Sequence, residues 1–179
     1  SVSGLVGPDI EPYVLQKLQA PSSSAHTLYV LLLAIPRSKP LPSLSAECKR
    51  IVLDWQYNSR LRCLAVDAWG HCARATVEEY RGIFNALEFS PRLGCQEVRV
   101  QLLTALSSNQ VRTADIDSIL AILHTFVEQD ASVQHVLDSL ASALVQQGLA
   151  TRIFNDRYRS PTSDKVNRLF VESLGKLLL

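Results

Sequence analysis

The residues that could do chemistry concentrate in one short stretch, residues 61–73, with the sequence LRCLAVDAWGHCA. It holds Cys63, His71 and Cys72, which are residue types that bind zinc or act as nucleophiles. Apolar spacing predicts that the stretch is an α-helix, which turns about 100° and rises about 1.5 Å per residue. Cys63 and Cys72 would then lie on opposite faces, and His71 would lie about 12 Å from Cys63 along the axis. Since zinc holds its ligands within about 2.3 Å, we expect no metal site and no cofactor.

A nucleophilic cysteine would need a neighbouring base and a polar setting. His71 is next to Cys72 in sequence but points about 100° away from it. Cys72 shares a predicted helix face with apolar residues, as a buried structural cysteine does: these are Leu61, Leu64, Ala65 and Ala68. The sequence contains no G-x-S-x-G, no phosphate-binding glycine loop and no H-E-x-x-H. We therefore predict that the protein is not an enzyme.

The composition is that of an ordinary globular protein, with 179 residues, 47% hydrophobic and 20% charged, and a net charge of +1. This balance gives no global attraction to nucleic acid or acidic membranes. The longest apolar run, residues 28–35, is far shorter than the roughly 20 residues of a membrane span, and no signal peptide is visible. Four cysteines without close pairing suit a reducing compartment. We expect an intracellular protein of the cytoplasm or nucleus. The absence of Met fits either a lost initiator or a segment of a longer chain.

The elements that position these residues are predicted to be helices in pairs. Apolar residues recur at three- and four-residue spacing, and strand-like alternation is scarce. Four segments can be superimposed whose starts lie 36, 37 and 35 residues apart, and such a step is typical of an α-solenoid. They start at Ala25, Leu61, Val98 and Val133. We predict one all-α domain over residues 1–179, an α-α superhelix of about four stacked antiparallel helix pairs plus a C-terminal helix. The pairs are expected at about 8–36, 43–75, 76–109 and 112–148, and the last helix at about 164–178.

Several local signals set the predicted helix ends. Thr76 and Glu79 form a capping box, and Gly148 is a helix stop. Residues 152–164 are predicted to form a loop. An apolar stripe should bury one face of the helix before residue 61; its members are Leu44, Cys48, Ile51, Val52 and Trp55.

The second helices resemble those of the HEAT-repeat family and, more loosely, of the armadillo family. Such a helix typically has an early Arg, an apolar-Ala step, and then a small residue and Leu-Gly. The stretch 61–73 is similar through Arg62, Ala65, Val66, Ala68, Trp69 and Gly70. The copy from Val98 is similar through Arg99, Leu102, Leu103, Ala105 and Leu106. The other two copies depart, with Gln134 and His26 in the Arg position. The resemblance covers roughly residues 8–148 and implies a helical solenoid.

The back of the second helices is the predicted partner-binding surface. The repeat register aligns Cys63 with Val100 and Val66 with Leu103, opposite the core stripe, where residues facing only water would be polar. With Asp67, these residues would line a groove for an amphipathic helix or peptide. The alternative is that neighbouring helices cover them. We predict a scaffold or adaptor in a larger hetero-oligomeric complex that binds another protein and no membrane.

The aromatic residues between positions 55 and 80 have two interpretations. Trp55, Tyr57, Trp69 and Tyr80 are either core packing or an anchor patch for a partner, since Trp and Tyr are enriched at binding hot spots.

A basic stretch supports a second hypothesis, a nucleic-acid-binding module. It contains Arg152, Arg157, Arg159, Lys165 and Arg168, with Phe154 and Tyr158 between them. Such a mixture could hold phosphates and stack on bases, or it could contact acidic side chains of a partner.

Overall fold

The computed structural model describes residues 9–88, 95–108, 113–124, 130–159 and 164–179, and all regular structure in these ranges is helical. The prediction of an all-α fold is confirmed. The α-helices are α1 (Glu11–Gln19), α2 (Ala25–Ala34), α3 (Ser45–Leu53), α4 (Ser59–Ala73), α5 (Val77–Glu88), α6 (Cys95–Ser108), α7 (Ile116–His124), α8 (Asp130–Gln146), α9 (Ala150–Arg159) and α10 (Lys165–Leu178). Short 3₁₀ turns are η1 (Ile35–Arg37), η2 (Pro42–Leu44) and η3 (Thr113–Asp115).

The chain forms two compact units, Ser1–Leu102 and Leu103–Leu179, with the boundary inside α6. From the sequence we predict one domain, and the superhelical stacking of all pairs stays a prediction. Among the described residues, no helix combines the length and the apolar character that a membrane crossing requires.

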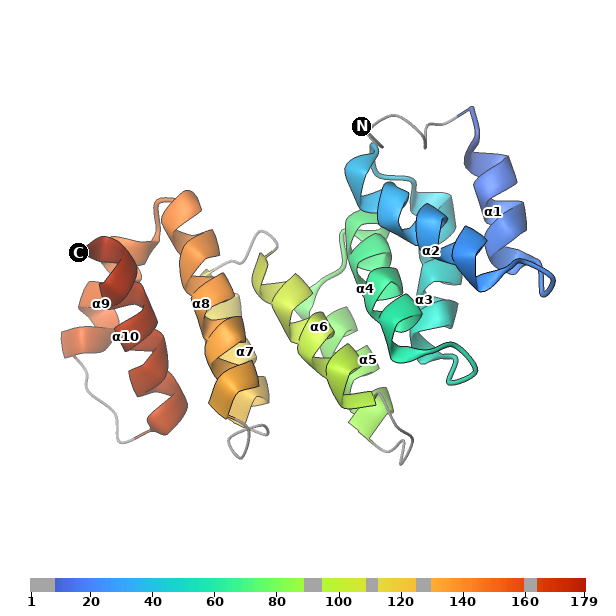
Figure 1. Cartoon of the computed structure of the whole chain (residues 1–179). Coiled ribbons are helices and arrows are strands. Elements are labelled where there is room, and N and C mark those ends of the chain that lie inside the picture. Colours follow the sequence, from blue (N-terminus) through green and yellow to red (C-terminus); the bar gives the residue numbers. More distant parts are fainter. Residues whose placement is uncertain (1–8, 89–94, 109–112, 125–129, 160–163) are drawn as a thin grey trace. The chain divides into compact units, whose positions relative to one another are not determined.

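In the first unit, second helices pack on second helices and first helices on first helices. α2 lies along α4, α1 contacts both α2 and α3, and α3 packs closely on α4 (Figure 1). The predicted stripe on α3 is fully buried at Leu44, Cys48, Ile51 and Val52, which confirms its period. Trp55 departs from it, because α3 ends at Leu53 and the tryptophan lies on the following turn.

The start of α5 confirms the predicted capping box. The Glu79 amide donates to Thr76 Oγ1 at 3.3 Å, and the Thr76 amide donates to Glu79 Oε2 at 2.8 Å. This reciprocal pair satisfies two of the amides that a helix start leaves without partners. The predicted apolar face follows and is buried; its members are Val77, Tyr80, Phe84 and Leu87.

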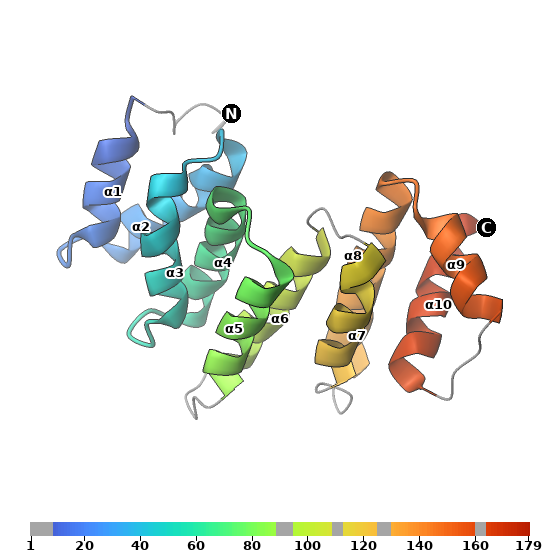
Figure 2. The ribbon, with the colours of Figure 1, turned by 180° about the vertical axis from the view of Figure 1, so that it is seen from behind.

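In the second unit, residues 150–159 form helix α9, so the loop predicted for residues 152–164 is wrong over that range (Figure 2). Arg152, Arg157 and Arg159 are charged, and charged residues at this density are typical of a solvated segment. Ile153 is nevertheless buried, and Arg157 lies over the Phe170 ring at 5.6 Å, so one face of α9 packs on α10. The predicted terminal helix, which begins at its N-cap Asp164, is therefore the second member of a further pair.

The end of α8 confirms Gly148 as the helix stop. Gly148 has φ of +70°, a conformation that glycine adopts without steric cost. The Leu149 amide donates to the Leu144 carbonyl at 2.9 Å, and the Gly148 amide donates to Val145 at 3.0 Å. These two bonds are those of a Schellman motif, and they turn the chain toward α9.

Candidate functional site

The predicted groove on the back of the second helices is not open at its two central residues. Val66 is 0% exposed and Leu103 is 2% exposed, so neither can contact a partner, and the prediction is corrected for both. Helix α6 lies against this face of α4, since Gln101 Nε2 donates to Asp67 Oδ1 at 2.7 Å. Cys63, Asp67 and Val100 are half-buried. The alternative, that neighbouring helices cover the strip, fits the structure better.

The polar groups at the seam between α4 and α6, where Gln101 meets Asp67, contribute to the packing of these helices. Burial raises the pKa of Asp67, and the hydrogen bond from Gln101 offsets part of that rise. Burial also raises the pKa of Cys63 to about 11, with the carboxylates of Glu97 and Asp67 adding to the effect. Cys63 is therefore a neutral thiol at pH 7 and a weak nucleophile.

The other candidate residues of the 61–73 stretch serve the core. Cys72 on α4 and Cys48 on α3 are both buried and lie next to each other. The hydrogen bond from Cys48 lowers the pKa of Cys72, and the same contact raises that of Cys48. His71 Nε2 lies 2.9 Å from the Ser38 carbonyl oxygen, to which it donates. Among the described residues, no three His, Cys, Asp or Glu side chains come together as metal ligands.

The aromatic residues divide into two groups. Trp69 and Tyr80 are buried and pack edge to face, with ring centroids 4.8 Å apart, so the core interpretation holds for them. Trp55 is 57% exposed, and Leu53 at the end of α3 is 40% exposed. Trp55 is therefore a surface residue, on the turn between α3 and α4, and its role as an anchor for a partner stays a prediction.

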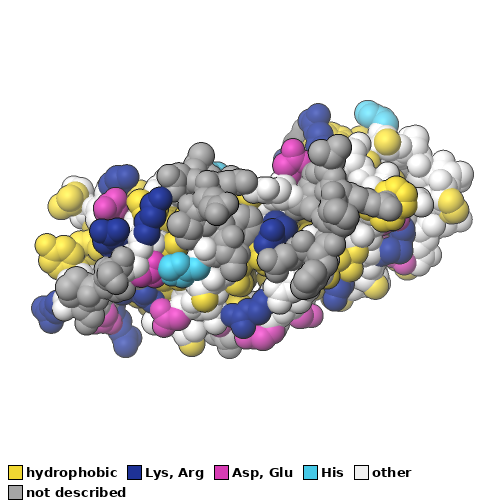
Figure 3. Space-filling view, turned by 90° about the horizontal axis from the view of Figure 1, so that it is seen from below, with side chains coloured by type: hydrophobic (Ala, Val, Ile, Leu, Met, Phe, Trp, Pro, Cys, Tyr) yellow, Lys and Arg dark blue, Asp and Glu magenta, His cyan; other side chains and the backbone are white. Residues whose placement is uncertain are grey.

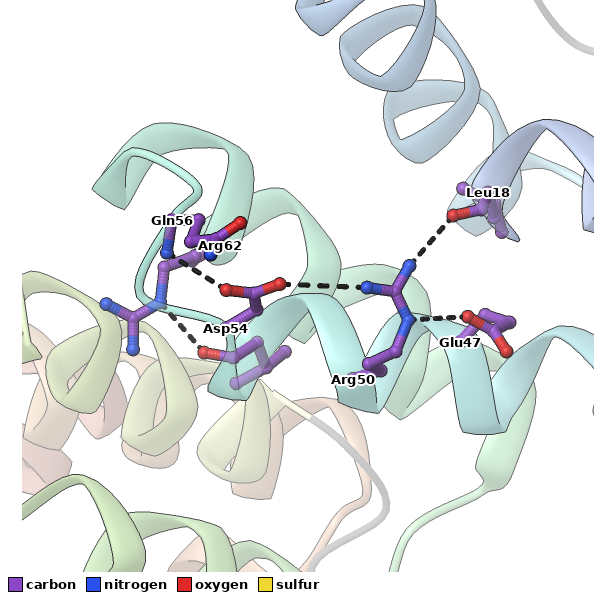
Figure 4. A network of polar contacts seen from close by, with 7 residues as sticks. Leu18, Glu47, Arg50, Asp54, Gln56 and Arg62 are labelled. Carbon is purple, nitrogen blue, oxygen red and sulfur yellow. Dashed lines mark hydrogen bonds and ion pairs between the residues drawn. The ribbon is translucent and has the colours of Figure 1, made fainter. Parts of the chain in front are cut away.

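A network of polar contacts holds this turn (Figure 4). Asp54 Oδ1 accepts from the Gln56 amide at 3.0 Å, and Asp54 Oδ2 lies 3.7 Å from Arg50 Nη1. From the other side, Arg62 on α4 donates through Nε to the Val52 carbonyl at 2.8 Å, and its side chain is buried. The turn is thus tied to both helices that it connects.

Arg50 extends the network toward α1. It donates through Nη2 to the Leu18 carbonyl at 2.9 Å and through Nε to Glu47 Oε2 at 2.7 Å. The bond from Arg50 lowers the pKa of Glu47. Because backbone and side-chain bonds converge on residues 50–62, Trp55 is presented by an ordered turn rather than by a long loop.

The five residues of the predicted basic stretch do not act alike. Arg157 faces inward, where it donates to Asn167 Oδ1 at 2.6 Å and pairs with Asp117, so it is a packing residue. Arg152 and Arg159 on α9, and Lys165 and Arg168 on α10, are exposed. Figure 3 shows basic side chains over these two helices with acidic ones among them.

Sequence reasoning missed the exposed position of Trp55, although a signal was present. Asn58 caps α4, its side chain accepting from the Leu61 amide at 2.9 Å. An Asn before an apolar run is a helix-start signal, and it would have placed Trp55 in a turn.

Comparison with known proteins adds no assignment, since no family model, no curated protein and no solved structure matches this chain.

Proposed function

We propose that this chain is a non-enzymatic protein-interaction module, a scaffold or adaptor subunit, and that the α3–α4 turn is its contact with a partner protein. The observation that supports this proposal is the exposure of Trp55 on a turn tied to α3 and α4. Tryptophan is enriched at the centres of protein interfaces, because burying its large ring on binding is strongly favourable.

The fixed turn also lowers the cost of binding. A contact group that is already ordered loses little conformational entropy when the partner arrives. Leu53 adds exposed apolar surface beside Trp55, so the complementary feature is an apolar side chain on a peptide or helix of the partner. This surface replaces the groove at Val66 and Leu103, which the fold has buried.

The test is partner capture by crosslinking and pull-down with the Trp55→Ala variant. We expect recovery of the partner that the unmodified chain captures to fall by about 30-fold or more, the effect of losing a hot-spot residue. Tyr13→Ala is the matched control, because Tyr13 is also an aromatic residue of the first unit and is likewise 57% exposed. Equal recovery with the two variants would contradict the proposed surface.

Nucleic-acid binding by the second unit is the second candidate function. It is supported by the exposure of Arg152, Arg159, Lys165 and Arg168 on two helices that pack together, with Tyr158 68% exposed among them. We would measure fluorescence anisotropy with a single-stranded 20-nucleotide RNA between about 50 and 200 mM salt. Binding that weakens steeply with salt, and weakens further in Arg152→Gln/Arg159→Gln, is the expected result. No binding at the lowest salt would exclude it.

A further inference from the structure

An open pocket lies where helices α2 and α4 begin, in the first unit. Its volume is about 390 Å³, within the range of ligand-binding pockets. The described residues that line it are Ala25, His26, Tyr29, Asn58, Arg60 and Leu61. The pocket is thus built by two helices that pack side by side, and neither helix could form it alone.

Arg60 crosses the pocket from α4 to α2. Its guanidinium carbon lies 4.8 Å from the centroid of the Tyr29 ring, and Nη2 donates to the Tyr29 hydroxyl at 2.7 Å. A guanidinium has five N–H donors in a planar fork, and this contact uses one of them. The tyrosine therefore holds the arginine in place and leaves donors of the fork available for a ligand.

The charges around the pocket favour an anion. Its described lining contains Arg60 and His26 and no carboxylate. The nearest acidic residue along the chain, Asp54, accepts from the Gln56 amide and lies 3.7 Å from Arg50 Nη1. The first backbone N–H groups of α2 and α4 add partial positive charge at the same place. The arginine–tyrosine pair carries the specificity, because a planar fork matches a carboxylate through two parallel hydrogen bonds.

The pocket adjoins the α3–α4 turn. Trp55 precedes Asn58 by three residues, so their Cα atoms lie within roughly 11 Å of each other. One extended peptide of four or five residues can span that distance.

We propose that this pocket binds the carboxylate of a Glu or Asp side chain in an acidic segment of a partner protein, with Arg60 as its bidentate contact. This inference rests on the proposed function, since it identifies the chemistry of the partner that also contacts Trp55.

The experiment is an NMR titration of the ¹⁵N-labelled protein with two pentapeptides. One has four glutamates around a central leucine, and the other has four glutamines in their place. We expect the acidic peptide to shift the amide signals of His26, Tyr29 and Arg60, and the neutral peptide to leave them in place.

Variants then separate the pocket from general charge attraction. Arg60→Gln should weaken binding of the acidic peptide about tenfold or more, since bonds to charged groups are among the strongest hydrogen bonds. Tyr29→Phe, which removes the hydroxyl that holds Arg60, should weaken it about threefold. Lys49→Gln removes an exposed cation of α3 outside the pocket and should change affinity by less than twofold. Equal losses in Arg60→Gln and Lys49→Gln would overturn the proposal.

The same measurements distinguish the two proposals. A flat titration, together with partner capture that is lost in Trp55→Ala, would overturn the pocket and leave the proposed function standing. Peptide binding at the pocket, together with partner capture that Trp55→Ala does not change, would support the pocket and contradict the role of Trp55.

Discussion

The middle of α4 and its beginning differ in how their chemistry is used. The middle holds the residue types that could bind a metal or act as nucleophiles. Cys72 and Trp69 are nevertheless buried there, and His71 donates a hydrogen bond to the Ser38 carbonyl. The beginning, with the turn before it, places Trp55 and Arg60 at the surface. The difference teaches that a side chain is available for binding only where neighbouring helices leave it uncovered.

Two arginines of α4 show the same contrast within one turn of helix. Arg62 is buried and donates to the Val52 carbonyl, so it closes the α3–α4 connection. Arg60 is exposed and lies over Tyr29 at the pocket. The same residue type therefore serves the fold at one position and offers a binding group at the other.

The largest expected effect concerns the two tryptophans. Trp69→Ala should lower the free energy of unfolding by about 3–5 kcal/mol, because it leaves a cavity in the core next to the Tyr80 ring. Trp55→Ala should cost clearly less, because more than half of the Trp55 surface is exposed. Urea unfolding followed by circular dichroism measures both. Similar losses in the two variants would show that the turn, too, is part of the packed core.

Fluorescence gives an independent control, because the chain has two tryptophans. Trp69→Phe leaves Trp55 as the emitter, and Trp55→Phe leaves Trp69. The first variant should emit at longer wavelength and be quenched readily by acrylamide, and the second should emit at shorter wavelength and resist quenching. The reverse order would contradict the assigned burial.

The two arginines give the next largest effect. Arg62→Ala should lower the free energy of unfolding by about 1–3 kcal/mol, since it leaves the Val52 carbonyl without this donor. Arg60→Ala should cost no more than about 0.5 kcal/mol, because its contact with Tyr29 is exposed. The same urea titration decides between them. An Arg60→Ala variant as unstable as Arg62→Ala would assign Arg60 to the fold.

Local signals predicted the helices well, because the groups involved lie within one turn of each other. The Thr76–Glu79 capping box and the stop at Gly148 are of this kind. The stripe on α3 also depends only on residues near one another in sequence, from Leu44 to Val52. The loop predicted for residues 152–164 failed because α9 is helical through its packing on α10, which lies further along the chain.

Which face of α4 is covered could not be predicted from α4 itself. The spacing of polar and apolar residues on this helix is compatible with an open strip or with a covered one. Val66 is buried, and α6, which comes about 35 residues later, contributes the Gln101 hydrogen bond to the neighbouring Asp67. The candidate site has the same limitation, since Arg60 and Tyr29 are 31 residues apart and only tertiary packing joins them.

The smallest expected effect is a pair of opposite pH dependences, one from each region. Burial raises the folded pKa of Asp67, so its contribution to stability is present below the unfolded pKa and is lost as pH rises through the folded value. Asp67→Asn removes this loss, and the amide oxygen can still accept from Gln101. The variant should therefore gain stability relative to the unmodified protein as pH increases from 3 to 7.

Glu47, which is linked to the turn through Arg50, should show the reverse. Arg50 lowers its folded pKa, so its contribution is present above the unfolded pKa and is lost as pH falls through the folded value. Glu47→Gln should be less stable than the unmodified protein at pH 7, and the difference should vanish toward pH 3. Arg50 is exposed and Glu47 is half-buried beside it, so solvent screens the pair and this difference is small. Urea midpoints measured from pH 3 to 7 test both slopes together. Slopes of the same sign would mean that burial does not dominate at Asp67, and the seam between α4 and α6 would then be open to water.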